Sequence, residues 1–183
     1  MFAGVPGNSA EDAWYSTAVL TEYLKVVGQD YSGATADLYK CFDQLVLELI
    51  EATLRTAGLP ERILRPYISC IKNLVVYNCF AGHIGEAHHH TNGIPQGCPF
   101  SMMIMALLAR LWILQTRTTN VRTRILADDI LVLASGKFHL KDFVEAFTNP
   151  LNFFIDIGGR ISAEKSFSFS SSSTARKWLQ HYT

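Results

Sequence analysis

The residues with the clearest chemical potential in this sequence are two adjacent carboxylates, Asp128 and Asp129. Both flanks are apolar and typical of short strands, which predicts a hairpin whose turn holds the pair. Two like charges about 4 Å apart repel by roughly 4 kcal/mol at an effective dielectric constant near 20, and a bound Mg²⁺ would relieve that repulsion. Successive strand residues point to opposite faces, so only one of the two is expected to face a given partner carboxylate.

The expected partner is Asp37, at the end of an earlier extended segment. Carboxylates from two strands can hold two Mg²⁺ ions roughly 3.5–4 Å apart, one activating a hydroxyl and the other stabilising a leaving phosphate oxygen. This is the chemistry of nucleotidyl transfer. The alternative is that Asp37 and Asp43 only cap the helix that follows them.

The elements that must position these residues follow from periodicity and turn chemistry. Ser9 and Asp12 form a capping-box pattern that opens a helix ending near Gly28. Further helices are predicted over residues 44–57, 61–72, 101–116 and 140–147, and after a break at Asn149-Pro150 helix continues to 157. Strands are predicted over residues 33–37, 74–80, 88–91, 122–126, 130–134 and 167–169. The last strand runs into the serines at 170–173. The order predicts an α+β fold with an antiparallel sheet covered by helices on one face.

Composition places the chain among globular proteins. It has 183 residues, 49% hydrophobic and 17% charged, enough for one domain that buries roughly 70% of its unfolded surface. The formal net charge of zero argues against nucleic-acid binding. However, no acidic residue occurs between Glu86 and Asp128, a stretch that holds four arginines, Arg110, Arg117, Arg122 and Arg124. This basic strip leads into the acidic pair; the alternative is a solvated charged face.

Cysteine and hydropathy patterns indicate an intracellular protein, in the nucleus or the cytoplasm, with no membrane role. The four cysteines form no CxxC pair, and the N-terminus has no secretory signal pattern. The most apolar run, Met102 to Leu114, is interrupted by Arg110 and is too short to cross a bilayer. His88, His89 and His90 are a candidate metal site, but the side chains of consecutive residues on a hairpin cannot all converge on one ion.

Four segments resemble motifs of one enzyme family. Asp37 to Asp43 matches D-x-x-K-x-F-D, and Gly93 to Ser101 is similar to G-I-P-Q-G-x-P-L-S. Leu126-Ala127-Asp128-Asp129 resembles Tyr-Ala-Asp-Asp, and Gly158-Gly159 with Lys165 resembles a fourth motif. In this order they resemble motifs A to D of the reverse transcriptases of non-LTR (LINE-type) retrotransposons and group II introns. Upstream, Gly4 to Ser9 resembles a fingers motif, G-F-x-x-G-R-S-T.

The resemblance implies roles for individual residues. Asp37 and Asp128 would be ligands of two Mg²⁺ ions, with Mn²⁺ as a substitute, and Asp129 a supporting acid near the primer end. Phe42 would collide with a ribose 2′-hydroxyl and so select deoxynucleotides, or else be a core aromatic. Gln96, with its neighbours Pro95 and Gly97, would approach the nascent base pair; the alternative is that these residues form an ordinary turn. Lys165 would protonate the departing pyrophosphate; the alternative is an ordinary surface lysine.

The same resemblance implies a polymerase palm with partial fingers and without a thumb. Residues 1–183 would form a reverse transcriptase-like domain, with partial fingers at 1–30, palm at 31–170 and a tail at 171–183. Its partners would be an RNA template, a DNA primer, dNTPs and the missing fingers and thumb segments of a longer polypeptide. Leu126 and Asn8 depart from the family's tyrosine and arginine. The expected activity is RNA-directed DNA polymerisation in a retroelement; the alternative is a non-catalytic remnant that acts as a maturase-like RNA-binding module.

Overall fold

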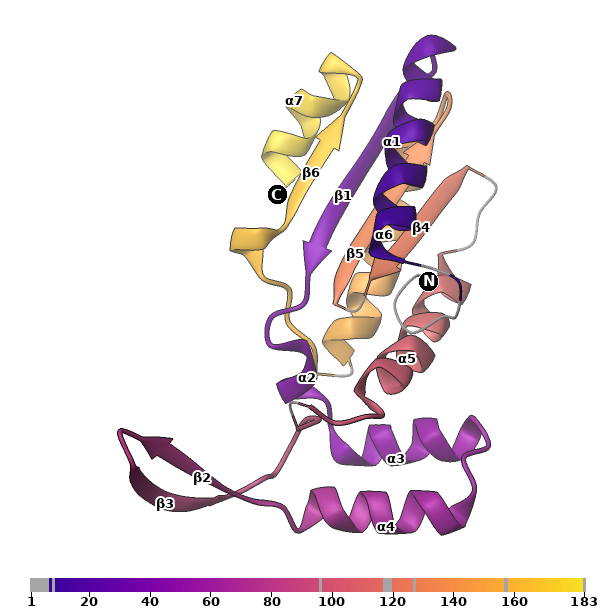
Figure 1. Ribbon diagram of the computed structural model, residues 1–183. Coiled ribbons are helices and arrows are strands. Elements are labelled where there is room, and N and C mark those ends of the chain that lie inside the picture. The colour runs from indigo at the N-terminus through magenta and orange to yellow at the C-terminus, as the bar shows by residue number, and fades with distance from the viewer. Residues whose placement is uncertain are drawn as a thin grey trace.

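The computed structural model describes residues 7, 9–95, 97–116, 120–126, 128–156 and 158–182. Figure 1 shows a sheet with helices around it and a two-stranded ribbon that projects away. The helices are α1 (Ala10–Val26), α2 (Cys41–Gln44), α3 (Leu47–Thr56), α4 (Glu61–Lys72), α5 (Ser101–Gln115), α6 (His139–Asp156) and α7 (Ser173–Tyr182), with a 3₁₀ turn, η1 (Ala163–Lys165). The strands are β1 (Tyr31–Asp37), β2 (Val75–Phe80), β3 (His83–His89), β4 (Val121–Leu126), β5 (Asp129–Ser135) and β6 (Phe167–Ser170).

The main sheet has the strand order β4-β5-β1-β6, and each neighbouring pair is antiparallel. The central pair, β1 and β5, runs in register from Tyr31 opposite Ser135 to Asp37 opposite Asp129. The antiparallel α+β architecture expected from the sequence is therefore confirmed. Strand β5 begins at Asp129 itself, whereas the sequence suggested that this residue belongs to the turn.

One face of the sheet packs against α6, and α5 packs against α6 and joins the same core. Alternate strand residues such as Ala34, Ala36 and Val132 point to this side and are buried, as the period of two along a strand requires. Across from them lie Trp112 of α5 and Phe143 of α6, each 2% exposed. Burying a large apolar side chain contributes about 1.5–3 kcal/mol, so this face holds most of the core.

Helix α5 is the apolar helix expected from the sequence, and it is buried against the core by Ile104, Met105, Leu108 and Ala109. Among the described residues, no helix combines the length and apolar character needed to cross a membrane.

The second face of the sheet carries α1, so helices do not lie on one face alone. Leu24 of α1 forms a small buried cluster with Tyr31 and Leu133, against which Phe169 packs. The helix begins with the predicted capping box: Ser9 Oγ accepts from the Asp12 amide at 3.2 Å, and the Ser9 amide donates to Asp12 Oδ2 at 2.7 Å. This cap fixes where the helix starts above the sheet.

The β2–β3 ribbon, residues Val75–His89, lies apart from the main sheet (Figure 1). Only Val75 is half-buried, and the other strand residues are exposed. At its base the His90 amide donates to the Leu74 carbonyl at 2.9 Å. Beside the ribbon, α3 and α4 pack against each other and bury residues in the main core.

Helix α6 runs through Asn149 and Pro150, so the predicted break is wrong. A proline inside a helix costs about 3 kcal/mol. Phe143 and Ala146 before this point and Phe153 after it pack on the same core cluster, and that burial offsets the cost. The helix predicted over 44–57 is α3, which begins only at Leu47 because Leu45 and Val46 are extended; Gln44 is the last residue of the short α2.

The C-terminal segment forms α7, where the sequence suggested only a tail. Leu179 and Ala175 are 3% exposed, and α7 packs against β6. The serine run supplies the helix start, since Ser172 Oγ accepts from the Ala175 amide at 3.4 Å. A run of serines can therefore begin a helix rather than a disordered end.

Candidate active site

Three carboxylates meet where β1 ends and the β4–β5 hairpin turns. Asp37 and Asp129 are direct cross-strand partners, and residues so placed share a face with Cβ atoms about 4.5–5.5 Å apart. Asp128 lies in the turn just before β5 and is half-buried. The register makes Asp129 the cross-strand neighbour of Asp37. The charge of Asp128, which the resemblance pairs with Asp37, acts together with that of Asp37 on the Cys41 thiol and on Asp129, so both members of the adjacent pair lie near Asp37.

Lys165 lies beside these carboxylates, with Nζ 3.4 Å from Asp37 Oδ2. Asp37 is 13% exposed and Lys165 is 72% exposed, so the pair is partly screened by water and is worth about 0–1 kcal/mol. The ammonium group is therefore near the carboxylates without being locked to them.

The segment that carries Lys165 is held against the end of β1 by its backbone. Leu38 bridges to Ile161, the Tyr39 amide donates to the Arg160 carbonyl at 2.8 Å, and the Ser162 amide donates to the Asp37 carbonyl at 2.9 Å. The Asp37 amide also donates to Ser166 Oγ at 3.2 Å. These contacts explain why Gly158-Gly159 and Lys165, far from Asp37 in sequence, belong to its site.

The electrostatics of this corner show an excess of negative charge. Burial, and then the charges of Asp128 and Asp37, raise the pKa of the Asp129 carboxyl, while Lys165 partly opposes the shift. Burial, followed by the same two charges, raises the pKa of the Cys41 thiol to about 12. Burial alone would raise both pKa values, but the added effect of Asp128 and Asp37 is that of negative charges close together, which a cation would relieve.

The donor chemistry of this corner fits Mg²⁺. Within the described residues, no group of three or more His, Cys, Asp or Glu side chains is placed to hold a metal ion. Mg²⁺ does not require such a cage, since it is usually bound by one or two carboxylates together with waters and substrate phosphates. Asp37 and Asp129, on adjacent strands, supply two carboxylates on one face of the sheet.

Phe42 lies on α2, half-buried against the core and joined to the glycine-rich loop. The Ile94 amide donates to the Phe42 carbonyl at 2.8 Å, and the Gly93 amide donates to the Leu45 carbonyl at 2.7 Å. At Gly93 φ is +92°, and a Cβ would lie 2.7 Å from the Phe42 oxygen. Only glycine allows this approach.

The next three residues of the glycine-rich loop, after Gly93 and Ile94, are Pro95, Gln96 and Gly97. Pro95 is half-buried and Gly97 is exposed with φ of +83°. Gln96 lies outside the described residues. The hydrogen bond from Ile94 to Phe42 therefore places Phe42 beside the loop that carries Pro95. The proposed contact of Gln96 stays a prediction.

Tyr67 of α4 is a supporting residue that the sequence analysis missed. Its hydroxyl lies 3.1 Å from Cys98 Sγ, and its ring meets Phe100 edge-on with centroids 4.9 Å apart. Burial, and then the Cys98 contact, raise the pKa of Tyr67. Tyr67 anchors the second half of the loop, and nothing in the local sequence signals a partner 31 residues away.

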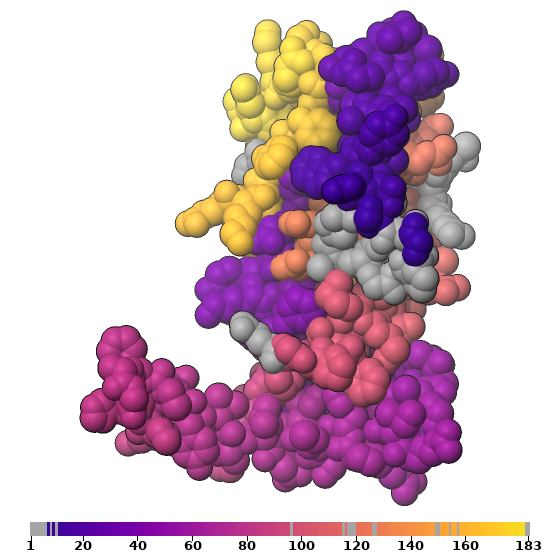
Figure 2. All heavy atoms as spheres, viewed as in Figure 1, coloured from indigo at the N-terminus to yellow at the C-terminus, as the bar shows by residue number. Residues whose placement is uncertain are grey.

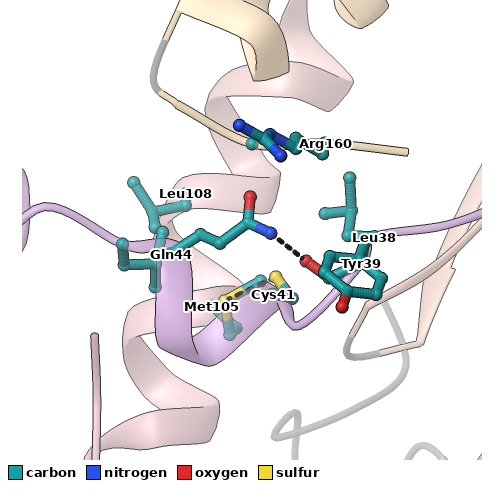
Figure 3. Close-up of a pocket in the computed structure, with 9 residues that line it drawn as sticks. Leu38, Tyr39, Cys41, Gln44, Met105, Leu108 and Arg160 are labelled. Carbon is teal, nitrogen blue, oxygen red and sulfur yellow. Dashed lines mark hydrogen bonds between the residues drawn. The ribbon is translucent and has the colours of Figure 1, made fainter. Parts of the chain in front are cut away.

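A small cavity of about 20 Å³ lies behind α2, lined by Leu38, Met105 and Leu108 among others. Figure 3 shows Gln44 reaching to the Tyr39 backbone, with Arg160 on the other side of the cavity; the Gln44 Nε2 to Tyr39 O distance is 2.7 Å. Gln44 Oε1 is buried without a hydrogen-bond partner. The cavity has room for about one water, which would satisfy that oxygen.

The cysteines and histidines behave as packing and surface residues. Cys41 is buried, with Sγ 3.7 Å from Met105 Sδ, and acts as a packing residue. His88 and His89 are exposed on β3, while His90 Nε2 lies 3.0 Å from the Gly93 carbonyl oxygen.

Of the arginines in the predicted basic strip, Arg110 is exposed on α5, and Arg122 and Arg124 lie on β4. Arg117 lies outside the described residues.

Comparisons with known proteins agree with this geometry. Residues 2–181 match the family described as reverse transcriptase (RNA-dependent DNA polymerase). No curated protein matches the sequence. Among solved structures, apo telomerase from Candida tropicalis truncated from its C-terminal domain superposes with a TM-score of 0.67 at 16% identity, covering 91% of this chain and 36% of that chain.

A second telomerase, from Candida albicans in complex with the TWJ fragment of telomeric RNA, gives a TM-score of 0.68 at 13% identity, covering 90% of this chain and 31% of that one. At such identities the likeness shows the fold alone. The chain spans about a third of the length of these solved proteins.

Proposed function

Because the chain belongs to the reverse transcriptase (RNA-dependent DNA polymerase) family, we propose that it is the palm of an RNA-directed DNA polymerase that adds dNTPs to a primer by two-metal catalysis. The observation that carries this proposal is the register of β1 and β5, which sets Asp37 opposite Asp129 with Asp128 in the adjoining turn. Carboxylates from separate strands are the arrangement that two-metal nucleotidyl transfer requires.

In this mechanism the carboxylates of Asp37 and Asp129, joined by Asp128 from the turn, would hold two Mg²⁺ ions, or Mn²⁺ in their place. When bound, such ions polarise an attacking hydroxyl and stabilise charge on the leaving phosphate oxygen. Lys165, exposed and with Nζ 3.4 Å from Asp37 Oδ2, would donate a proton to the departing pyrophosphate. Phe42 beside the glycine-rich loop would exclude a ribose 2′-hydroxyl.

The wider assignment rests on the sequence motifs. We propose that residues 1–30 belong to the fingers and 31–170 to the palm, with the remainder, which contains α7, after it. The partners would be an RNA template and a DNA primer, together with fingers and thumb segments of a longer polypeptide. The motif set favours a retroelement origin and an intracellular location, in the nucleus or the cytoplasm.

The test is primer extension on an RNA template with Mg²⁺ and dNTPs. Removing one metal ligand costs several kcal/mol of charge stabilisation, so Asp37→Asn and Asp129→Asn are expected to lose about 1000-fold in rate. Asp156→Asn, the same change at an exposed position of α6, is the matched control and should extend normally. Substituting rNTPs tests Phe42, since extension should fail with them. Undiminished extension by Asp37→Asn would refute the metal site.

A second candidate is a non-catalytic RNA-binding module of the maturase type. It is favoured by the Lys165–Asp37 ion pair, which gives Asp37 a cationic partner without a metal. In that case the Asp37→Ala variant should still bind RNA at low salt. Neither the wild type nor any of the variants should extend the primer. Failure to bind any RNA at low salt would rule this candidate out.

A further inference from the structure

A cavity of about 370 Å³ lies between α1 and the outer face of the sheet. Figure 2 shows α1 in indigo on the front of the molecule, next to β6 in yellow, and Figure 1 shows the strands behind it. The volume falls in the range of about 300–1,000 Å³ that is typical of small-molecule sites. Asp129 and Lys165 form one end of the cavity, so it adjoins the candidate active site.

The walls of the cavity suit a flat apolar ligand. Trp14 contributes from α1, and Phe167 and Phe169 contribute from β6 with ring centroids 6.5 Å apart. Trp14 is 74% exposed and Phe167 is 62% exposed, although both are large and apolar. Aromatic rings favour offset or edge-on contact with another ring, so a planar aromatic group would bury surface that water now covers.

The floor of the cavity holds a cation with no counterion. Arg124 is half-buried on β4, and its Nε–H donates to Ser16 Oγ at 3.0 Å. Among the described residues no carboxylate lies within ion-pair distance of its guanidinium. Burial, and then the neighbouring Arg122, lower the pKa of Arg124. An anion placed here would relieve a partly desolvated charge.

A second polar group lines the same cavity. Thr35 Oγ1 is buried and makes no hydrogen bond with any residue that the structure describes. A buried hydroxyl without a hydrogen bond is unfavourable, and a ligand atom in the cavity would supply the missing partner. Lys165 adds a positive charge and Asp129 a negative one, so with Arg124 the net charge of the lining is positive.

We propose that this cavity binds a planar aromatic anion, with its ring against Trp14 and Phe169 and its charged group on Arg124. The ligand would also touch Asp129 and Lys165. This last contact rests on the proposed function, because it predicts that an occupied cavity blocks nucleotidyl transfer.

The binding test uses a defined probe, 8-anilinonaphthalene-1-sulfonate, whose fluorescence rises in an apolar site. The folded protein should bind it saturably with one site per chain. Arg124→Gln should weaken binding about tenfold, as the loss of a charged hydrogen bond implies. Arg122→Gln is the matched control: it removes the same charge two residues away on the same strand, at an exposed position that does not line the cavity, and should bind as the wild type does.

Two further comparisons distinguish recognition of the anion from non-specific hydrophobic binding of the probe. N-phenyl-1-naphthylamine has the same rings without the sulfonate and should bind about tenfold more weakly. Thr35→Val removes the unpaired hydroxyl and should weaken probe binding while leaving the melting temperature unchanged or higher. If the neutral probe binds as tightly as the anion, or Arg124→Gln and Arg122→Gln bind equally, the proposal is overturned.

The link to catalysis is measured separately. Where primer extension occurs, saturating 8-anilinonaphthalene-1-sulfonate should inhibit it in the wild type and much less in Arg124→Gln. Saturable binding without inhibition would support the anion site but refute the claim that an occupied cavity blocks nucleotidyl transfer. A protein that extends no primer would contradict the proposed function, and the fluorescence titration would still decide the cavity's ligand.

Discussion

Two antiparallel strand pairs in this chain have opposite environments. In the central pair, β1 and β5, most side chains are buried or half-buried, whereas the β2–β3 ribbon exposes nearly all of its residues. Phe80 is 86% exposed, Ile84 71% and Tyr77 55%. Both pairs are antiparallel, but the ribbon has a register shift between Tyr77 and Cys79 while the central pair is regular, so the two differ in pairing as well as in burial.

The difference shows what each pair can do. An isolated two-stranded hairpin is at best marginally stable in water, so the ribbon depends on its turn and on local strand propensity. Its turn residues, Ala81 and Gly82, both have positive φ, as tight hairpin turns require. The central pair is held from both faces, and it carries Asp37 and Asp129. Rigid support is concentrated where the carboxylates lie.

Cysteine reactivity should give the largest contrast between the two regions. Cys41, behind the carboxylates, is buried with a pKa of about 12, which at pH 8 lowers the thiolate fraction roughly 1000-fold relative to an ordinary thiol. Cys79 is exposed on the ribbon. Iodoacetamide labelling of the native protein, followed by peptide mass spectrometry, should modify Cys79 at least about 1000 times faster. Similar rates would mean that the packing around Cys41 opens readily.

Matched phenylalanine truncations should differ by several kcal/mol. Phe143→Ala removes a ring that is 2% exposed and should lower the free energy of unfolding by about 3–5 kcal/mol. Phe80→Ala in the ribbon should change it by less than about 0.5 kcal/mol. Urea denaturation measures both, and Phe143→Leu provides a milder variant if the alanine protein does not fold. Equal losses would show that the ribbon is packed in solution.

Two glycines allow the same comparison at smaller scale. A Cβ at Gly33 of β1 would lie 2.6 Å from the Val132 carbonyl oxygen and 2.7 Å from the Phe169 ring, so Gly33→Ala should cost about 1–3 kcal/mol. At Gly85 of the ribbon the nearest atom would be 3.3 Å away, at the Asn78 carbonyl. Gly85→Ala should change the free energy of unfolding by less than about 0.5 kcal/mol. A larger loss at Gly85 would contradict the contrast.

Charge at the site should give the smallest effect. The raised pKa of Asp129 means that the folded state disfavours its ionised form, so that cost is present at neutral pH and disappears as the pH falls through the folded-state pKa. Without divalent cations, Asp129→Asn should therefore raise the melting temperature at pH 7 by about 1–2 °C, because screening at this exposed residue keeps the gain below 1 kcal/mol.

The advantage of Asp129→Asn should shrink in acid. Glu86→Gln, at the exposed carboxylate of the ribbon, should leave the melting temperature unchanged at either pH. Mg²⁺ should raise the melting temperature of the wild type and not that of Asp129→Asn. A wild type that is more stable than Asp129→Asn in the absence of metal would show that the carboxylates do not repel one another.

The sequence predicted elements well where local chemistry decides them. Helix α4 has the predicted bounds, because Pro60 precedes it and its apolar period is regular. The turn before Asp129 followed from two flanking apolar strands. Local rules failed where distant packing outweighs them, as at Pro150 inside α6. At α7 the local signal was present, since serine is a preferred helix cap, but the serine run was interpreted as a tail.

The candidate site was predictable in its residue types but not in its geometry. The motifs identified Asp37, Asp128, Asp129 and Lys165, yet only strand register shows that Asp129 lies opposite Asp37. Tyr67 gave no local signal, because its importance comes from its contact with Cys98, and the basic strip included Arg124 without showing that it lines a cavity.

The hydrogen bond between the His90 amide and the Leu74 carbonyl has an evolutionary consequence. The chain enters and leaves the β2–β3 ribbon at adjacent positions, so the segment between Leu74 and His90 is a loop whose two ends are already joined. Doubling the length of such a loop costs only about 0.6 kcal/mol of closure entropy. Insertions at Gly82 should therefore be accepted, and this position is where a lineage could add a new module without moving a carboxylate.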